Sequence, residues 1–285
     1  MDFNLIKDID RAKTVLGMNE KRIAAFLGVS TMTLSRWRRN LVNPSQETLE
    51  KVYGCIYDAG VNLNRIKEEL EGSKTKEGHV LLFHGAKGEL KGKPSVAFGD
   101  TNKDFGRAFY LGESFNQSAS FIVNYDSSSV YAFDFNPEGI VTKEFSVSRE
   151  WAILIAYFRG KLKDYEDSPY VRSLVSSLEG VDVVIAPIAD NTMYTILDEF
   201  VAGKMTDLQC LSALSANRLG RQFAFLNDGA IRKGLRFQER LFFCQSERRD
   251  YRAYREKEDA IGKDKVKLAL REYAGKGVYI EELLA

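Results

Sequence analysis

The sequence predicts an α+β protein built from two different parts. Residues 3–71 lack strand-like alternation, and their apolar residues recur at spacings of three and four, as on one face of a helix. Short apolar and aromatic runs follow at residues 81–84, 181–187 and 222–226. A polar stretch with two glycines, residues 71–78, lies between the two parts. We therefore predict an all-helical N-terminal domain followed by a domain of strands and helices.

The boundaries follow from these patterns. We place the helical domain at residues 1–71, a linker at 72–79, the mixed domain at 80–245 and a charged tail at 246–285. Within the mixed domain, residues 129–136 alternate as a strand, and Ser148 and Pro169 are typical of helix starts. In the tail we predict a helix over residues 263–274.

The composition is that of an ordinary folded protein. Of the 285 residues, 44% are hydrophobic, which is enough for a substantial core. The 41 basic and 40 acidic residues nearly cancel, so any nucleic-acid binding has to be local. Cys55, Cys210 and Cys244 make neither a disulfide framework nor a metal pattern with the two histidines. We expect a cytoplasmic protein without a metal or a membrane segment, because its longest apolar runs are too short to span a bilayer.

Residues 20–39 are the centre of the helical domain. Gly28 permits a turn between two crossed helices, and Ser30 can cap the second one. The positions where the helices would meet are apolar, namely Ala24, Leu27, Val29 and Leu34. This pattern resembles the helix-turn-helix of Xre/Cro-type regulators, including the Asn-Pro pair at residues 43–44.

The resemblance implies that the second helix enters the major groove of DNA, with its early residues toward bases and its basic end toward phosphates. We predict base contacts from Thr31, Thr33 and Arg36, and backbone contacts from Ser30, Ser35, Arg38 and Arg39. A single module of this kind needs a partner copy for useful affinity, so we expect a homodimer. The alternative is a helical module that binds protein and carries its arginines on a solvated face.

Two short motifs in the mixed domain carry chemistry. An apolar strand ends in His84-Gly85, and a loop with the sequence Asp-Phe-Gly-Arg, residues 104–107, leads into Tyr110. Neutral His84 both donates and accepts hydrogen bonds, which suits a ribose hydroxyl, and Gly85 leaves its backbone open to a ligand. The ring of Tyr110 can lie on a flat heteroaromatic group. Taken singly, such residues are more often structural.

In this order the motifs resemble those of the ADP-ribosyltransferase superfamily, in its His-Tyr-Glu branch, and more closely an uncharacterised bacterial group within it. The resemblance covers residues 80–245 and implies a split β-sandwich with helices that uses NAD as a substrate. It implies that His84 binds a ribose of NAD, the Gly85 backbone holds the nicotinamide amide, and Tyr110 stacks on nicotinamide. The remaining residues that it places at NAD are Asp104, Arg107 and Phe109.

The third motif of the superfamily is a glutamate at the start of a later strand, and here the chain departs from the pattern. The best-matching strand begins with Gln222, whose neutral amide can bond a ribose hydroxyl but offers neither a base nor a full negative charge. Glu239 precedes another aromatic strand and is the competing catalytic candidate. The alternative interpretation of Glu239 is an ordinary solvent-facing charge beside Arg240 at a strand edge. We favour Gln222.

These features predict a DNA-binding mono-ADP-ribosyltransferase that modifies a macromolecule. Asp190 follows the strand at 181–187 and either reaches the acceptor or a ribose, or caps the next helix. By analogy, such a domain pairing suggests a toxin of a toxin–antitoxin system or a phage-defence effector in bacteria, with a neutralising protein partner. The alternative is a non-enzymatic transcription regulator that senses NAD or a related nucleotide, which the missing carboxylate at position 222 favours.

Overall fold

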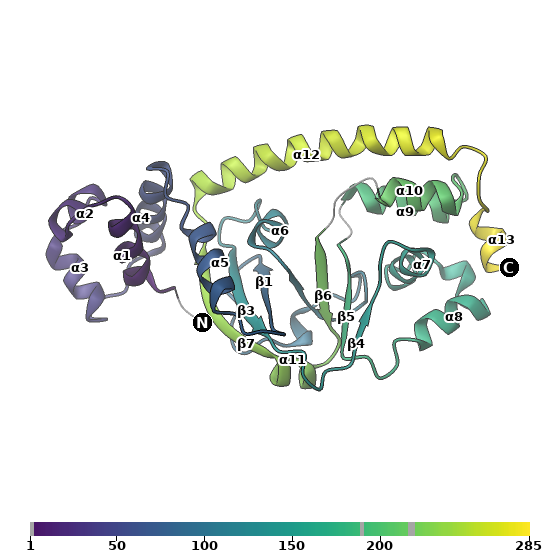
Figure 1. Ribbon diagram of the computed structural model, residues 1–285, viewed down its shortest axis with the longest axis horizontal. Helices are drawn as coiled ribbons and strands as arrows, with labels where there is room; N and C mark the ends of the chain where they lie inside the picture. Colours follow the sequence, from purple (N-terminus) through teal and green to yellow (C-terminus); the bar gives the residue numbers. More distant parts are fainter. Residues whose placement is uncertain (1–2, 189–190, 216–219) are drawn as a thin grey trace. The chain divides into compact units, whose positions relative to one another are not determined.

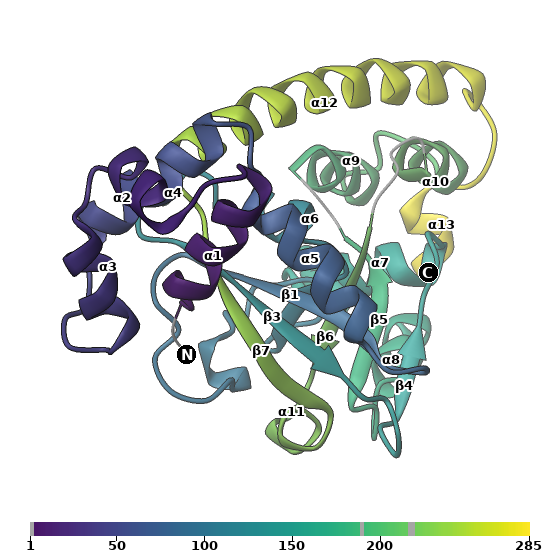
Figure 2. The same ribbon diagram turned by 60° about the vertical axis from the view of Figure 1, so that its left-hand side comes forward.

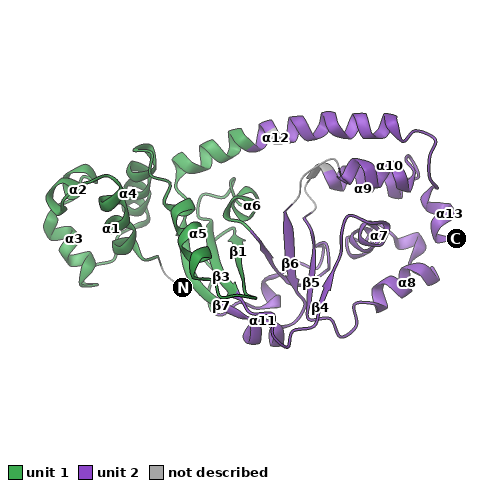
Figure 3. Ribbon diagram, in the orientation of Figure 1, with its two compact units in different colours: residues 1–92, 114–134, 237–254 green, residues 93–113, 135–236, 255–285 purple. Residues whose placement is uncertain are grey.

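The computed structural model describes residues 3–188, 191–215 and 220–285. It is a mixed α+β protein in which an N-terminal helical region precedes a seven-stranded sheet with helices (Figure 1). The strand order in the sheet is β4-β5-β6-β2-β1-β3-β7. The chain divides into two compact units, coloured separately in Figure 3. Unit 1 holds residues 1–92, 114–134 and 237–254, and unit 2 holds residues 93–113, 135–236 and 255–285.

The helical region of unit 1 is built from short helices with matching starts. Its helices are α1 (Leu5–Val15), α2 (Glu20–Phe26), α3 (Thr31–Arg38), α4 (Gln46–Asp58) and α5 (Leu63–Lys74). Each follows an Asn or Ser whose side chain accepts a hydrogen bond from the backbone N–H three residues later. Gly28 has φ +67° in the turn between α2 and α3, a conformation that favours glycine. Ala24, Leu27 and Leu34 are buried in one cluster there, as the sequence predicts.

The same hydrophobic cluster extends from the helical region to the end of β7 (Leu235–Phe242). The ring of Tyr53 in α4 stacks on Phe242 with 4.6 Å between the centroids, and Phe3 meets Phe242 edge-on. These contacts bury aromatic surface that neither the helices nor the strand could cover alone. The helical region is therefore part of the packed core of unit 1.

A second core lies beside the strands of unit 1. It is formed around β1 (Val80–Ala86), β3 (Ser129–Phe135) and α6 (Phe115–Ser120), with α5 and α6 visible beside these strands in Figure 2. Phe83, Phe115 and Leu241 are each almost fully buried in it. The predicted strand at residues 129–136 is thereby confirmed to within one residue.

Two boundaries differ from the prediction. Helix α5 continues to Lys74, through the first residues of the predicted linker, because local bonds replace tertiary packing there: Ser73 Oγ donates to Leu70 O, and Lys74 pairs with Glu71. Helix α12 (Gln245–Glu272) begins well before the predicted start at residue 263. It runs through buried Gly262, and a single glycine weakens a helix without ending it.

Unit 2 contains β2 (Phe109–Gly112), β4 (Thr142–Glu144), β5 (Val183–Pro187) and β6 (Arg221–Phe225). Strand β5 runs parallel to β4 and antiparallel to β6, and β2 is also antiparallel to β6. In this register Gly112 lies opposite Gln222, and Gln222 lies opposite Ala186. The pairing brings residues of the predicted second and third motifs onto neighbouring strands.

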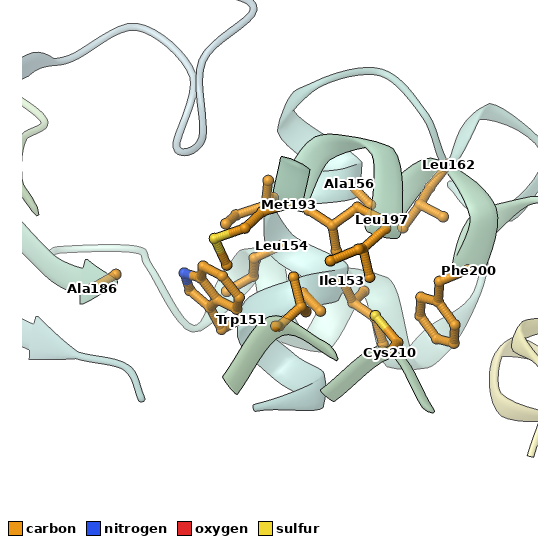
Figure 4. Packing of buried hydrophobic residues seen from close by; sticks show 14 of the residues in the cluster. Trp151, Ile153, Leu154, Ala156, Leu162, Ala186, Met193, Leu197, Phe200 and Cys210 are labelled. Atoms are coloured by element: carbon orange, nitrogen blue, oxygen red, sulfur yellow. The ribbon is translucent and has the colours of Figure 1, made fainter. Parts of the chain in front are cut away.

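The core of unit 2 surrounds α7 (Arg149–Phe158), which Ser148 caps as predicted. Figure 4 shows Trp151 and Leu154 of α7 packed with Met193 and Leu197. The other helices that lie entirely in unit 2 are η1 (Val96–Phe98), η2 (Lys163–Tyr165), α8 (Pro169–Ser176), α9 (Asn191–Val201), α10 (Asp207–Ser215), α11 (Asp228–Gly234) and α13 (Ile280–Leu284). All six residues from 151 to 156 are buried, which explains why this part of the helix is apolar on every side.

Candidate functional site

The loop before β2 is closed by its own tyrosine. Gly106 turns the chain with φ +69°, and the hydroxyl of Tyr110 donates to Gly106 O at 2.8 Å while it accepts from the Phe105 N–H at 2.9 Å. Burial raises the pKa of Tyr110, so its hydroxyl stays neutral and keeps both bonds. The half-buried ring of Tyr110 therefore has a fixed position, and the loop that carries Asp104 is fixed with it.

Gln222 reaches this loop from β6. Its Nε2 donates to Asp104 Oδ2 at 2.7 Å and to Pro187 O, at the end of β5, at 3.1 Å. Both Gln222 and Asp104 are buried, with 6% and 4% of their surfaces exposed. The structure thus joins two residues that the sequence assigned separately, Asp104 to NAD binding and Gln222 to catalysis.

Two further side chains hold Asp104, and no local signal in the sequence points to either. Arg159, which follows α7, donates from Nε and Nη2 to Asp104 Oδ1 at 3.0 and 2.8 Å. Tyr194 of α9 donates to the same oxygen at 3.0 Å, and the Arg159 guanidinium lies 3.4 Å from the centre of the Tyr194 ring. Burial, followed by the charge of Asp104, raises the pKa of Tyr194. We refer to Asp104, Arg159, Tyr194 and Gln222 as the Asp104 cluster.

The other predicted NAD contacts lie in several environments. His84 is half-buried on β1, in unit 1. Gly85 follows it, and a Cβ there would come within 2.5 Å of Ser118 O in α6, so packing against α6 already requires glycine. Phe109 is buried on β2, whereas Arg107 is exposed. The remaining predicted contact, Asp190, lies outside the described residues.

Glu239 is buried, so its interpretation as a solvent-facing charge is wrong. It lies within unit 1, with Oε1 3.4 Å from Lys67 Nζ and 3.5 Å from Arg11 Nη1. Both cations also pair with Asp8, which has no exposed surface. A strand residue flanked by polar neighbours becomes buried here because the N-terminal helices supply cations to it, an arrangement that no local pattern predicts.

The predicted DNA-contacting residues all lie on or next to α3, and several are already engaged. Ser30 caps the helix, and its Oγ lies 2.9 Å from Thr33 Oγ1. The Arg39 guanidinium donates to the backbone oxygen and to the hydroxyl oxygen of Ser35. Thr31 and Arg36 are exposed.

Arg38 is engaged most strongly. It donates two hydrogen bonds to the carboxylate of Asp10, at 2.8 and 2.9 Å, and also pairs with Glu20 at 3.2 Å. These bonds, above all the one to Asp10, raise the pKa of Arg38, and Arg38 in turn lowers the pKa of Asp10.

The fold and these contacts define a mixed α+β protein with an N-terminal helical region, a seven-stranded sheet, and a buried polar cluster at the β2–β6 pair. The family model described as protein of unknown function (DUF3990) matches residues 80–237. That match covers more than half of the sequence, and the chain belongs to this family. No curated protein and no solved structure matches the chain.

Among the described residues, no helix has both the length and the apolar character to cross a membrane, and no group of His, Cys, Asp and Glu is arranged to hold a metal.

Proposed function

We propose that the chain is an NAD-dependent mono-ADP-ribosyltransferase of the split β-sandwich type, preceded by a helix-turn-helix that binds DNA. The observation that carries this proposal is the contact between the second and third motifs. Gln222 on β6 is bonded to Asp104 of the loop that leads into Tyr110 on β2, and β2 and β6 are paired. A loop fixed by buried bonds is what positions a ligand accurately.

In the proposed reaction the bond between nicotinamide and C1′ of its ribose breaks, and nicotinamide leaves with the bonding electron pair. The acceptor nucleophile then forms a bond to C1′ and gives its proton to solvent. Gln222 accepts a hydrogen bond from a ribose hydroxyl, and the ring of Tyr110 lies against nicotinamide. His84 and Gly85 enter the proposal from their place in the first motif, as contacts to the ribose and the carboxamide.

The proposed partners are DNA, a macromolecular acceptor and a second copy of the chain, in the bacterial cytoplasm. A toxin or phage-defence effector that a protein partner neutralises fits this combination. The second candidate is a transcription regulator that senses NAD without turning it over. It is favoured by Gln222 itself, since an amide replaces the carboxylate of the superfamily.

The test incubates the purified chain with NAD and bacterial lysate and detects ADP-ribosylated products by mass spectrometry. We expect products from the wild type and at least a tenfold loss in His84→Ala. Tyr110→Phe keeps the ring but removes the hydroxyl that closes the loop, and Phe98→Ala, an exposed aromatic of η1, serves as the control. NAD that raises the melting temperature without any product supports the sensor instead. Absence of both effects removes both candidates.

The DNA-binding proposal makes a prediction that separates two arginines of α3. Arg36 is exposed, and no ion pair engages it among the described residues, so Arg36→Ala is expected to weaken DNA binding and to lower the salt slope of log K by about 1. Arg38 is shared with Asp10 and Glu20, so Arg38→Ala is expected to change that slope less.

Fluorescence anisotropy with mixed-sequence duplex DNA over a range of salt concentrations measures both slopes. Because the Arg38 ion pairs are exposed, their loss is expected to lower the free energy of unfolding by only about 0.5 kcal/mol. Equal slopes for the wild type and Arg36→Ala would remove Arg36 from the phosphate contacts.

A further inference from the structure

The amide of Gln222 has one orientation only. Its Nε2 faces Asp104 Oδ2 at 2.7 Å and Pro187 O at 3.1 Å. An ion-paired carboxylate and a backbone carbonyl both accept and cannot donate, so the NH2 group has to face them. The carbonyl oxygen, Oε1, is turned away from both, and no donor in the described part of the chain is bonded to it. Gln222 therefore presents an acceptor on its remaining side.

The two oxygens of Asp104 have separate tasks. Oδ1 accepts the two bonds from Arg159 and the one from Tyr194, which fix the carboxylate in place. Oδ2 accepts from Gln222. The negative charge of Asp104 therefore lies one hydrogen bond from the Gln222 amide, and such a bond polarises the amide so that Oε1 becomes a stronger acceptor.

We propose that Asp104 is a positioning residue that holds the carbonyl of Gln222 toward a ribose hydroxyl of NAD, and that the two residues together replace the single glutamate of the third motif. This inference rests on the proposed function. The glutamine supplies the acceptor, and its bond to the Asp104 carboxylate strengthens that acceptor near the ribose, where positive charge develops as nicotinamide leaves. The ligand group selected is a hydroxyl donor on the nicotinamide ribose.

The arrangement reverses the simplest expectation for position 222. Gln222→Glu would place a second carboxylate about 2.7 Å from Asp104, and two carboxylates at that distance cannot both stay ionised. It would also set an acceptor against Pro187 O. The substitution that resembles the superfamily most closely is therefore expected to reduce activity.

The decisive test exchanges the two groups. In Asp104→Asn the amide oxygen can keep the bonds from Arg159 and Tyr194, but the new NH2 group faces the NH2 group of Gln222. The Gln222 amide then has to turn over, so that its carbonyl oxygen faces the introduced asparagine and no longer the ligand. In the double variant Asp104→Asn/Gln222→Glu, the introduced asparagine donates to the introduced carboxylate, and the remaining defect is a carboxylate oxygen that faces Pro187 O where the wild type has a hydrogen bond. We expect each single variant to lower kcat/KM for NAD tenfold to a hundredfold, and the double variant to recover to within about fivefold of the wild type.

Ligand affinity separates positioning from a structural role. NAD carries the nicotinamide ribose and ADP does not, so calorimetry with both ligands should show that Asp104→Asn weakens binding of NAD and leaves binding of ADP unchanged. If Asp104→Asn folds poorly, Tyr194→Phe takes its place. It removes one bond to Oδ1 and is expected to give a smaller loss of NAD affinity. Asp228→Asn, which alters another partly buried aspartate of unit 2, is the matched control and should change neither affinity.

Three results would overturn the inference while leaving the proposed function in place. The first is full NAD affinity in Asp104→Asn, or in Tyr194→Phe if that variant is the one that folds. The second is a double variant no better than the poorer single one. Equal losses for NAD and ADP would make the cluster merely structural and would also overturn it. A wild type that neither binds nor consumes NAD would refute the proposed function and this inference together.

Discussion

Asp8→Asn is expected to lower the free energy of unfolding of unit 1 by about 3 kcal/mol. Asp8 has no exposed surface and pairs with Lys67 Nζ at 2.5 Å and with Arg11 at 2.9 Å, and it accepts a 2.7 Å bond from Tyr53. Lys67 is itself only 1% exposed. Removing one charge leaves two cations facing Glu239 alone, and an uncompensated buried charge is far more costly than a lost surface pair.

Urea unfolding followed by tryptophan fluorescence can measure this change within unit 1. The two tryptophans of the chain are Trp37 in α3 and Trp151 in α7, so a Trp151→Phe background reports on the helical region. Asp10→Asn is the control, because Asp10 belongs to an exposed pair with Arg38 and should matter by less than about 1 kcal/mol. If Asp8→Asn and Asp10→Asn unfold at the same urea concentration, the buried ion pairs of Asp8 stabilise the protein no more than the exposed pair of Asp10.

Glu247→Gln is expected to remove a pH dependence of stability between about pH 5 and pH 8. Burial raises the pKa of Glu247 to about 8, and the 2.7 Å bond from Asn64 lowers it only in part. Within that pH range the folded chain keeps a proton that the unfolded chain has released. The stabilisation from this group is therefore complete below the unfolded pKa and is lost as the pH rises through about 8.

The glutamine variant mimics the protonated acid, so it should match the wild type near pH 5 and be more stable by about 3 kcal/mol at pH 8. Urea unfolding at a series of pH values measures the difference. Glu69→Gln on α5 is the control, because the side chain of Glu69 is 67% exposed and its substitution should leave the pH profile unchanged. A wild-type profile that is flat from pH 5 to pH 8 would contradict a raised pKa for Glu247.

The features that the sequence predicted correctly depend on near neighbours in the chain. Gly28 has the positive φ that a tight helix connection needs, and Ser30 and Ser148 bond the backbone N–H three residues later. The strand at β5 could be recognised because its residues are apolar on both faces. Such signals are complete within a few residues, whatever the rest of the chain does.

The features that the sequence missed depend on residues far apart in the chain. Asp104 and Gln222 could each be selected from their motifs, but their mutual bond requires the β2–β6 register. Arg159 and Tyr194 stand at a helix end and on a helix, where their spacing is ordinary, and only the packing of α7 and α9 brings them to Asp104. The linker was placed too early because a polar stretch with glycines also forms the end of α5.

The buried pairing of Glu239 with Lys67 and Arg11 also bears on how the chain could have been assembled by recombination. The family match ends at residue 237, two positions before Glu239, whereas both cations belong to the N-terminal helices. A gene fusion that exchanged those helices for an unrelated domain would leave the buried Glu239 carboxylate without its two cationic partners. We therefore expect that, among relatives, a charged residue at position 239 is inherited together with this helical region and is replaced by an apolar residue where the region is absent.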